Sequence, residues 1–226
     1  MIKLVIFDLD NTLVDFTKMK RLAVANAVDA MIDAGLTIPK EEMLEKIFHV
    51  YKREGIEDQK VFDKTLQEAF GIVDYKILAA GIVGYKRAKE LALSPYPHAT
   101  MVLNKLARSG IHLAIVSDAP RLQAWTRITS LGLQHAFDYV VAFEDTGEKK
   151  PSPKPFAKAM NHFKVNPEET LMIGDWAERD MVGAKNLGIR TAFARYGDEF
   201  DTKDPGADYE LNDISEILEI VEKDKA

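Results

Sequence analysis

The strongest constraint on the fold is an alternation of short apolar runs with amphipathic stretches after residue 94. Apolar runs bounded by turn residues predict buried strands, and apolar residues at helical spacing predict helices between them. The expected strands are residues 2–7, Ile111–Val116, Tyr139–Ala142, Thr170–Ile173 and Arg190–Ala194. The expected helices are Ala99–Ser109, Pro120–Leu131, Pro153–Phe163, Glu178–Leu187 and Asp213–Glu222. This alternation predicts a parallel sheet with helices on both faces.

A second pattern lies between the first strand and the rest of the sheet. Apolar residues in 16–94 recur at helical spacing over about four stretches, which predicts helices and no strand. The breaker cluster Ser94-Pro95-Tyr96-Pro97 ends this block. We therefore expect a Rossmann-like α/β core domain made of residues 1–15 and 95–226. An all-helical domain of residues 16–94 is inserted into it.

Composition excludes several classes of protein. The 226 residues include no cysteine, which rules out disulfides, thiolate zinc sites and cysteine nucleophiles. A net charge of −6 without a long basic run argues against general nucleic-acid binding. No apolar run reaches the roughly 20 residues of a membrane helix, so no membrane partner is expected. The apolar N-terminus meets Asp8 too soon for a signal peptide, so we expect a cytoplasmic protein.

Polar residues follow four of the expected strands, where sheets of this kind bind ligands. They are Asp8, Asp10, Thr12, Ser117, Asp118, Glu144, Asp145, Lys149, Lys150, Asp175 and Asp180. The i, i+2 spacing of Asp8 and Asp10 puts both carboxylates on one face, where they repel unless a cation separates them. With Asp175 they provide three hard oxygen donors, a set that suits Mg²⁺ together with phosphate oxygens.

These groups suggest hydrolysis of a phosphate ester. Asp8 would attack phosphorus and form an aspartyl-phosphate. Asp10 would protonate the leaving oxygen and later accept a proton from water. A Ser hydroxyl and a Lys ammonium would bind the phosphoryl oxygens.

Each short motif also has a purely structural interpretation. Asp10-Asn11-Thr12 matches a turn with a helix cap, and Ser117-Asp118-Ala119-Pro120 matches a helix N-terminus. Lys149 and Lys150 match a solvated loop pair, and Asp180 matches a first-turn residue of a helix. Only the combination of these motifs at the ends of different strands favours catalysis.

The combination closely resembles the haloacid dehalogenase superfamily. Asp8-Leu9-Asp10-Asn11-Thr12 resembles its first motif, and Ser117 resembles the second. Residues 147–156 resemble the third motif, whose spacing selects Lys150 over Lys149 as the phosphate lysine. Gly174-Asp175 with Asp180 resembles the fourth.

The resemblance implies roles for these residues. Asp8, Asp10, Ser117 and Lys150 would be catalytic. Mg²⁺ would be held by Asp8, the backbone carbonyl of Asp10, and Asp175, while Asp180 would bind the metal through water or orient Lys150. Contacts with the substrate are expected from Thr12, Asp118, Ala119 and Trp176. The inserted helices would form a C1-type cap.

Two residues depart from the common pattern of the superfamily. Asp118 stands where Asn is frequent, and Trp176 follows Asp175 where a small or polar residue is usual. Caps set specificity in this superfamily, so four further residues are candidates for substrate contacts: Phe16, Met19, Lys20 and Arg53.

We therefore predict a Mg-dependent phosphatase that hydrolyses a small phosphorylated metabolite such as a sugar or triose phosphate. A phosphosugar mutase remains an alternative, since it forms the same aspartyl-phosphate. A 2-haloacid dehalogenase is disfavoured by Asp10, which such members typically lack. A phospho-switch resembling a receiver domain is disfavoured because such a domain is about half this length and has its phosphorylated Asp on an internal strand. Here Asp8 comes at the end of the first strand, and a cap follows it. The oligomeric state is expected to be a monomer or a homodimer.

Overall fold

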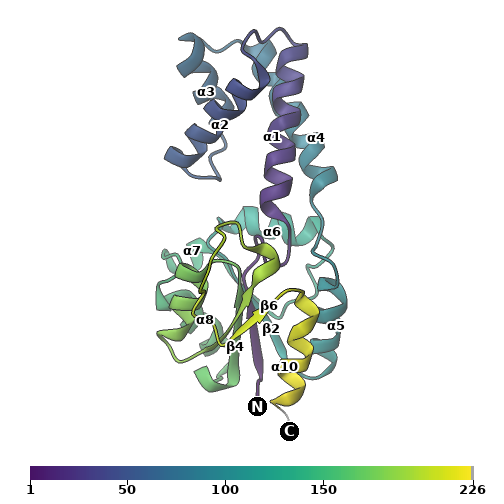
Figure 1. Cartoon of the computed structure of the whole chain (residues 1–226), viewed down its shortest axis with the longest axis vertical. Coiled ribbons are helices and arrows are strands. Elements are labelled where there is room, and N and C mark those ends of the chain that lie inside the picture. The colour runs from purple at the N-terminus through teal and green to yellow at the C-terminus, as the bar shows by residue number, and fades with distance from the viewer. Residues whose placement is uncertain (225–226) are drawn as a thin grey trace. The chain divides into compact units, whose positions relative to one another are not determined.

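A computed structural model describes residues 1–224, which form two compact units (Figure 1). One unit combines residues 1–15 with the chain from Ser94 onward, and the other is Phe16–Leu93. Among the described residues, no helix combines the length and apolarity needed to cross a membrane.

The first unit is built on six parallel strands in the order β3-β2-β1-β4-β5-β6. Their bounds are β1 Leu4–Phe7, β2 His112–Val116, β3 Tyr139–Val141, β4 Thr170–Gly174, β5 Arg190–Ala194 and β6 Tyr209–Leu211. β1 lies between β2 and β4, and the order of strands reverses there, so the three neighbouring carboxyl ends form one rim. Five of the strands match the expected positions. The edge strand β6 was not expected because Tyr209 and Glu210 are exposed and give no apolar run.

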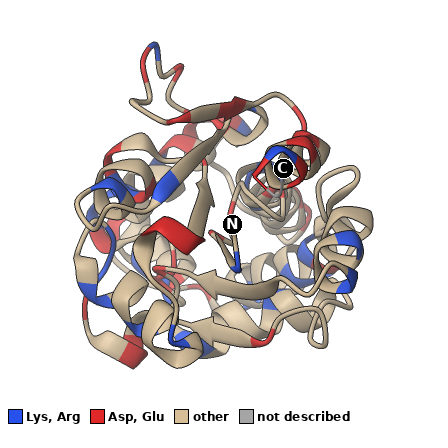
Figure 2. Ribbon diagram, turned by 90° about the horizontal axis from the view of Figure 1, so that it is seen from below, with Lys and Arg blue, Asp and Glu red and all other residues tan. Residues whose placement is uncertain are grey.

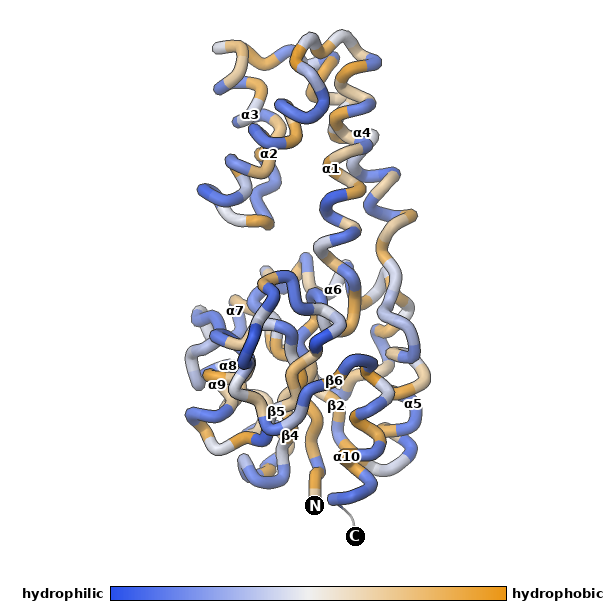
Figure 3. The backbone as a smooth tube through the Cα atoms, in the orientation of Figure 1, coloured by the Kyte–Doolittle hydropathy of each residue, from blue (hydrophilic) through white to orange (hydrophobic). Residues whose placement is uncertain are grey.

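Helices cover both faces of this sheet, with α8 on one face and α5 and α10 on the other (Figure 1). Their bounds are α5 Ala99–Arg108, α6 Arg121–Ser130, α7 Phe143–Thr146, α8 Pro153–Phe163, α9 Val182–Lys185 and α10 Ile217–Lys223. Lys, Arg, Asp and Glu lie mainly on the surrounding helices and loops (Figure 2). The central strands are hydrophobic along their length (Figure 3).

The core between the sheet and α8 is apolar and fully buried. Phe156 and Ala159 of α8 pack in one cluster with Leu4 and Ile6 of β1 and Met172 of β4. Burial of a side chain the size of Phe156 stabilises the fold by about 2–3 kcal/mol. This packing fixes β1 and β4, the two strands that end at the proposed site.

One expected helix differs in the structure. The segment predicted as Glu178–Leu187 begins with a wide π turn at Ala177–Met181, followed by the short helix α9. The backbone N–H of Asp180 donates to the carbonyl of Trp176, and the Asp180 carboxylate accepts from the N–H of Trp176. The Asp180 side chain is buried within the protein, and π turns are frequent at functional sites.

The second unit contains four helices, as the periodicity predicted: α1 Phe16–Asp33, α2 Lys40–Glu54, α3 Val61–Phe70 and α4 Tyr75–Ala92. The Asp74 side chain caps α4 by accepting from the N–H groups of Lys76 and Ile77. Gly81 and Gly84 let α4 approach α1 closely. A Cβ at Gly84 would lie 2.7 Å from the carbonyl oxygen of Asn26 on α1.

Asp224, just after α10, should stabilise the core unit in a pH-dependent way. It pairs with Arg190 of β5 at 2.5 Å and accepts from the N–H of Ile2. The bond from Arg190 is the main reason that the Asp224 pKa falls to about 2. We expect Asp224→Asn to lower the free energy of unfolding at pH 7 by about 1 kcal/mol.

Because the folded pKa is depressed, this stabilisation is present above the unfolded pKa and is lost as pH falls through about 2. Chemical unfolding at several pH values between 7 and 2 measures the difference. Glu219→Gln, at an exposed position of α10, is the control and should change little. A deficit of Asp224→Asn that stayed constant down to pH 2 would contradict the expectation.

Candidate active site

Three carboxylates and one ammonium group converge at the carboxyl ends of β1 and β4. Carboxylate oxygens of Asp8, Asp175 and Asp180 all lie within 4.8 Å of one another, and all three residues are buried. The Lys150 ammonium lies 2.5 Å from Asp8 Oδ1 and 2.7 Å from Asp180 Oδ1. Three negative charges against one positive charge leave an excess of two. Buried carboxylates need a compensating cation, so these residues fit a divalent metal ion.

The pKa values of the cluster agree with this interpretation. Burial raises the pKa of Asp8 to about 7, although the neighbouring Lys150 ammonium acts to lower it. Burial also raises the pKa of Asp175 well above its usual range, and the nearby Asp8 and Asp180 carboxylates add to this effect. For Lys150, burial acts to lower the pKa, but Asp180 and Asp8 outweigh it, so the ammonium form persists. A bound cation would displace protons from the carboxylates.

Backbone contacts hold the acidic side chains in place. A Cβ at Gly174 would lie 2.3 Å from the carboxyl carbon of Asp180, so only glycine leaves room for this carboxylate. A Cβ at Gly197 would lie 1.7 Å from the carbonyl oxygen of Asn11. Asn11 itself has a φ of 59°, a conformation that Asn adopts more readily than most residues. The loop after β1 is therefore fixed by backbone that approaches it closely.

Thr12 was expected to contact the substrate, but the structure places it inside the protein. Its side chain is fully buried, and its hydroxyl donates to Asp175 Oδ1 at 3.0 Å. Its carbonyl oxygen accepts from the Tyr196 hydroxyl at 2.9 Å. Thr12 therefore orients the Asp175 carboxylate.

The loop after β2 contains the three neighbouring predicted residues, Ser117, Asp118 and Ala119. Ser117 is buried, and its Oγ accepts from the N–H of Ala119, itself buried, at 3.2 Å. Asp118 Oδ1 accepts from the backbone N–H of Lys150 at 2.8 Å. Asp118 Oδ2 accepts from the Arg179 guanidinium at 3.1 Å. Asp118 thus fixes the loop that presents Lys150.

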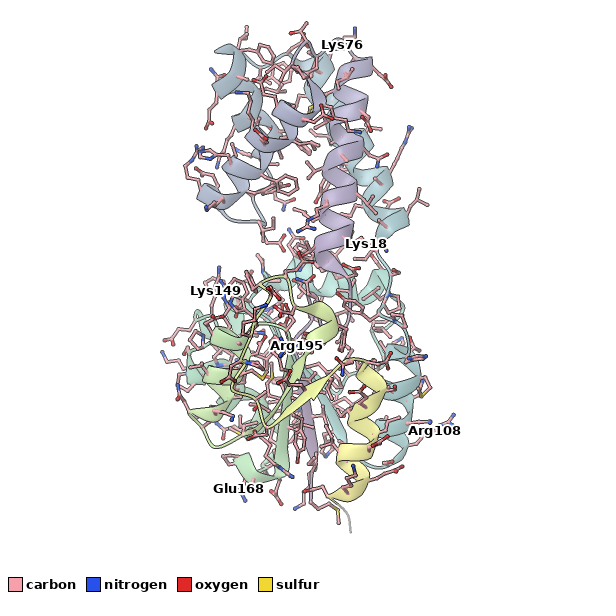
Figure 4. The ribbon with its side chains drawn as sticks, viewed as in Figure 1. Lys18, Lys76, Arg108, Lys149, Glu168 and Arg195 are labelled. Atoms are coloured by element: carbon pink, nitrogen blue, oxygen red, sulfur yellow. The ribbon has the colours of Figure 1, made fainter. Side chains whose placement is uncertain are left out.

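The two adjacent lysines have different surroundings. Lys150 is 4% exposed and enters the carboxylate cluster. Lys149 lies on the surface, with its ammonium 5.6 Å from the ring centre of Phe143 (Figure 4). This placement agrees with the spacing that selected Lys150.

Trp176 forms an aromatic rim beside Asp175. It is half-buried, and the Arg179 guanidinium stacks on its ring at 3.6 Å. The Phe200 ring, which is exposed, lies 4.6 Å from it. This rim offers apolar faces and stays a predicted substrate contact.

The candidate residues in Phe16–Leu93 have different environments. Phe16, Met19 and Lys20 are buried. The Lys20 ammonium lies 3.0 Å from the Tyr85 hydroxyl and 4.3 Å from the Tyr51 ring centre. Arg53 is exposed and pairs with Glu54 and Glu68.

Sequence reasoning missed Arg127. It is 2% exposed, and its guanidinium donates to Asp10 Oδ2 at 2.8 Å. The signal was present in the sequence, because Arg127 falls on the same helical face as the apolar residues Ala124 and Ile128. A charged residue on an apolar helix face indicates a buried carboxylate partner.

Comparison with known proteins agrees with the geometry. Residues 5–194 match the family model of haloacid dehalogenase-like hydrolases. Glyceraldehyde 3-phosphate phosphatase of Pyrococcus furiosus is 34% identical, over 99% of this chain and 94% of its own. The Methanocaldococcus jannaschii phosphatase of the same name is also 34% identical, over 98% and 97%. A solved HAD phosphatase from Thermococcus onnurineus is 26% identical, covers 97% of this chain and 98% of its own, and superimposes with a TM-score of 0.70.

The chain therefore belongs to the haloacid dehalogenase-like hydrolases. The predicted family and fold class are confirmed. The phosphatase names of the relatives bear out the predicted enzyme class, a hydrolase that acts on phosphoric monoesters.

A divalent cation should stabilise the protein strongly. At a concentration 100 times the dissociation constant, we expect a gain of about 2.7 kcal/mol in the free energy of unfolding. Asp175→Asn should abolish this gain. Without metal, however, the variant should be at least as stable as the wild type, because one of three mutually repelling carboxylates is gone.

Thermal unfolding with EDTA and with added Mg²⁺, Mn²⁺ or Ca²⁺ measures both effects. Asp201→Asn, at an exposed loop residue, is a matched control that should keep the full response. An Asp175→Asn variant that kept the response to metal would contradict the assignment of this residue.

Proposed function

We propose that this chain is a magnesium-dependent phosphatase of a small phosphorylated metabolite, with glyceraldehyde 3-phosphate as the first candidate substrate. The observation that carries the proposal is the buried Asp8 carboxylate, placed between the Lys150 ammonium and two further carboxylates. The substrate is supported by the relatives of that name, which are 34% identical over nearly the whole chain. Oxygen donors of this kind are those that Mg²⁺ prefers.

In the first step, an oxygen of Asp8 attacks phosphorus and the bond to the leaving oxygen breaks. Asp10 gives its proton to that oxygen, and an aspartyl-phosphate forms. In the second step, water attacks phosphorus, Asp10 takes a proton from the water, and the bond to Asp8 breaks. Inorganic phosphate leaves and both carboxyl groups return to their starting states.

The other residues bind and neutralise the phosphoryl group. Lys150 is held as an ammonium by Asp8 and Asp180, at the place where phosphoryl oxygens would gather. Ser117 would donate its hydroxyl to one of these oxygens. Asp8, the Asp10 carbonyl and Asp175 would hold Mg²⁺, which would neutralise phosphate charge and make phosphorus more electrophilic. Asp180 would orient the Lys150 ammonium, with which it forms an ion pair.

Asp8→Asn should lower metal-dependent phosphate release from glyceraldehyde 3-phosphate by about 10⁴-fold or more, because an amide is a poor nucleophile. The assay is phosphate release with Mg²⁺ and with EDTA. Asp201→Asn is the matched control, since the same change at an exposed residue should leave the rate unaltered. Full turnover in Asp8→Asn would rule out the proposed nucleophile.

Lys150→Met and Lys149→Met provide a second matched pair. We expect Lys150→Met to lower kcat/KM by about 10²-fold or more, because its ammonium would contact charge that develops at phosphorus. Lys149→Met should change kcat/KM less than about threefold, as its ammonium is solvated. Equal effects in the two variants would contradict the assignment. Thermal unfolding of both variants checks that the folds are intact.

A further inference from the structure

Arg127 is a buried charged residue to which the mechanism above gives no role. It lies on α6, whose inward face also contains Ala124 and Ile128. The Arg127 side chain is 3% exposed, and its guanidinium forms an ion pair with Asp10 at 2.8 Å. Asp10 is the residue that moves the proton in both proposed steps. The one cation on this helix face therefore contacts a reacting group.

The geometry of α6 explains how Arg127 reaches the site. The helix starts just after Ser117-Asp118-Ala119-Pro120, so its N-terminus lies at the rim of the sheet. Helical side chains tilt towards the N-terminus of their helix. Arg127, in the second turn, is long enough to reach back over the first turn. It meets the loop after β1 there.

Energetic considerations favour a functional reason for this residue. A buried guanidinium requires a paired and hydrogen-bonded environment, and an apolar side chain of similar volume is often equally stable or better. The position lies on an apolar helix face, where Leu or Met would pack. Arg also has a rigid, planar group that fixes the orientation of a carboxylate more strictly than Lys does.

We propose that Arg127 is a positioning residue, which holds the Asp10 carboxyl group in the orientation for proton transfer. Its guanidinium donates to Oδ2, which restrains rotation of the carboxyl group, and Oδ1 would exchange the proton. This inference rests on the proposed phosphatase function. The same contact serves both steps, because the proton given to the leaving oxygen is regained from water.

The test compares an aliphatic ester, glyceraldehyde 3-phosphate, with an aryl ester, p-nitrophenyl phosphate. Nitrophenolate leaves without protonation, whereas the aliphatic oxygen needs the proton of Asp10. In Arg127→Gln we expect kcat/KM to fall by about 10²-fold or more for the aliphatic ester and by less than about tenfold for the aryl ester. The aryl ester should also give a burst of nitrophenol followed by slow turnover, because breakdown of the aspartyl-phosphate still needs Asp10.

Two further variants separate positioning from support of the fold. Arg121→Gln, at an exposed residue of the same helix, should leave both esters unaffected. Arg127→Lys keeps the charge and should show a smaller difference between the esters, in the same direction. It also serves as the test if Arg127→Gln does not fold, which thermal unfolding shows.

The outcomes distinguish the two proposals. A selective loss on the aliphatic ester with a nitrophenol burst supports the inference. Equal losses on both esters in a folded, active variant overturn it and leave the phosphatase function intact. A wild-type protein that hydrolyses neither ester overturns both, because Asp10 would then transfer no proton.

Discussion

The ion pairs of Lys150 with Asp8 and Asp180 are the interaction on which the site depends. Asp8 directly follows β1, Asp180 lies in the turn after β4, and Lys150 comes from the segment between β3 and α8. These segments are far apart in sequence. They meet because the order of strands reverses at β1, so that the carboxyl ends of β1 and its neighbours lie on one rim of the sheet. A buried ammonium needs these partners, and the carboxylates need the ammonium. The fold brings these groups together, and their ion pairs in turn make the burial of each charged group tolerable.

Each of the two carboxylates after β1 pairs with a different cation. Lys150 pairs with Asp8, and Arg127 pairs with Asp10. The i, i+2 carboxylates would otherwise repel on one face of the loop. Because each has its own partner, the two side chains can be held close together and still perform different tasks. In the proposed mechanism, Asp8 attacks phosphorus and Asp10 transfers protons.

The sequence was informative where periodicity and spacing decide structure. Apolar runs located five of the six strands, and motif spacing separated Lys150 from Lys149. The sequence was uninformative where a contact between distant residues determines the structure. The edge strand β6 has two exposed residues, and the π turn depends on hydrogen bonds between Asp180 and Trp176. The helical pattern indicates that Arg127 is buried, but its partner Asp10 lies 117 residues away, so no local pattern identifies that partner.

Tertiary contacts also account for the two departures from the common pattern of the superfamily. An Asn at position 118 would offer one acceptor oxygen, whereas Asp118 uses two. Oδ1 accepts from the backbone of Lys150 and Oδ2 from the Arg179 guanidinium. That guanidinium stacks on Trp176, the other unusual residue, at 3.6 Å. Asp118 and Trp176 are therefore connected through Arg179. The Asp118 carboxylate contacts both the backbone of the Lys150 loop and the guanidinium that stacks on Trp176. The second oxygen of Asp118 therefore links the Trp176 ring to the Lys150 loop through Arg179. In the proposed function, this link would couple binding of the phosphate to contact with the attached carbon skeleton.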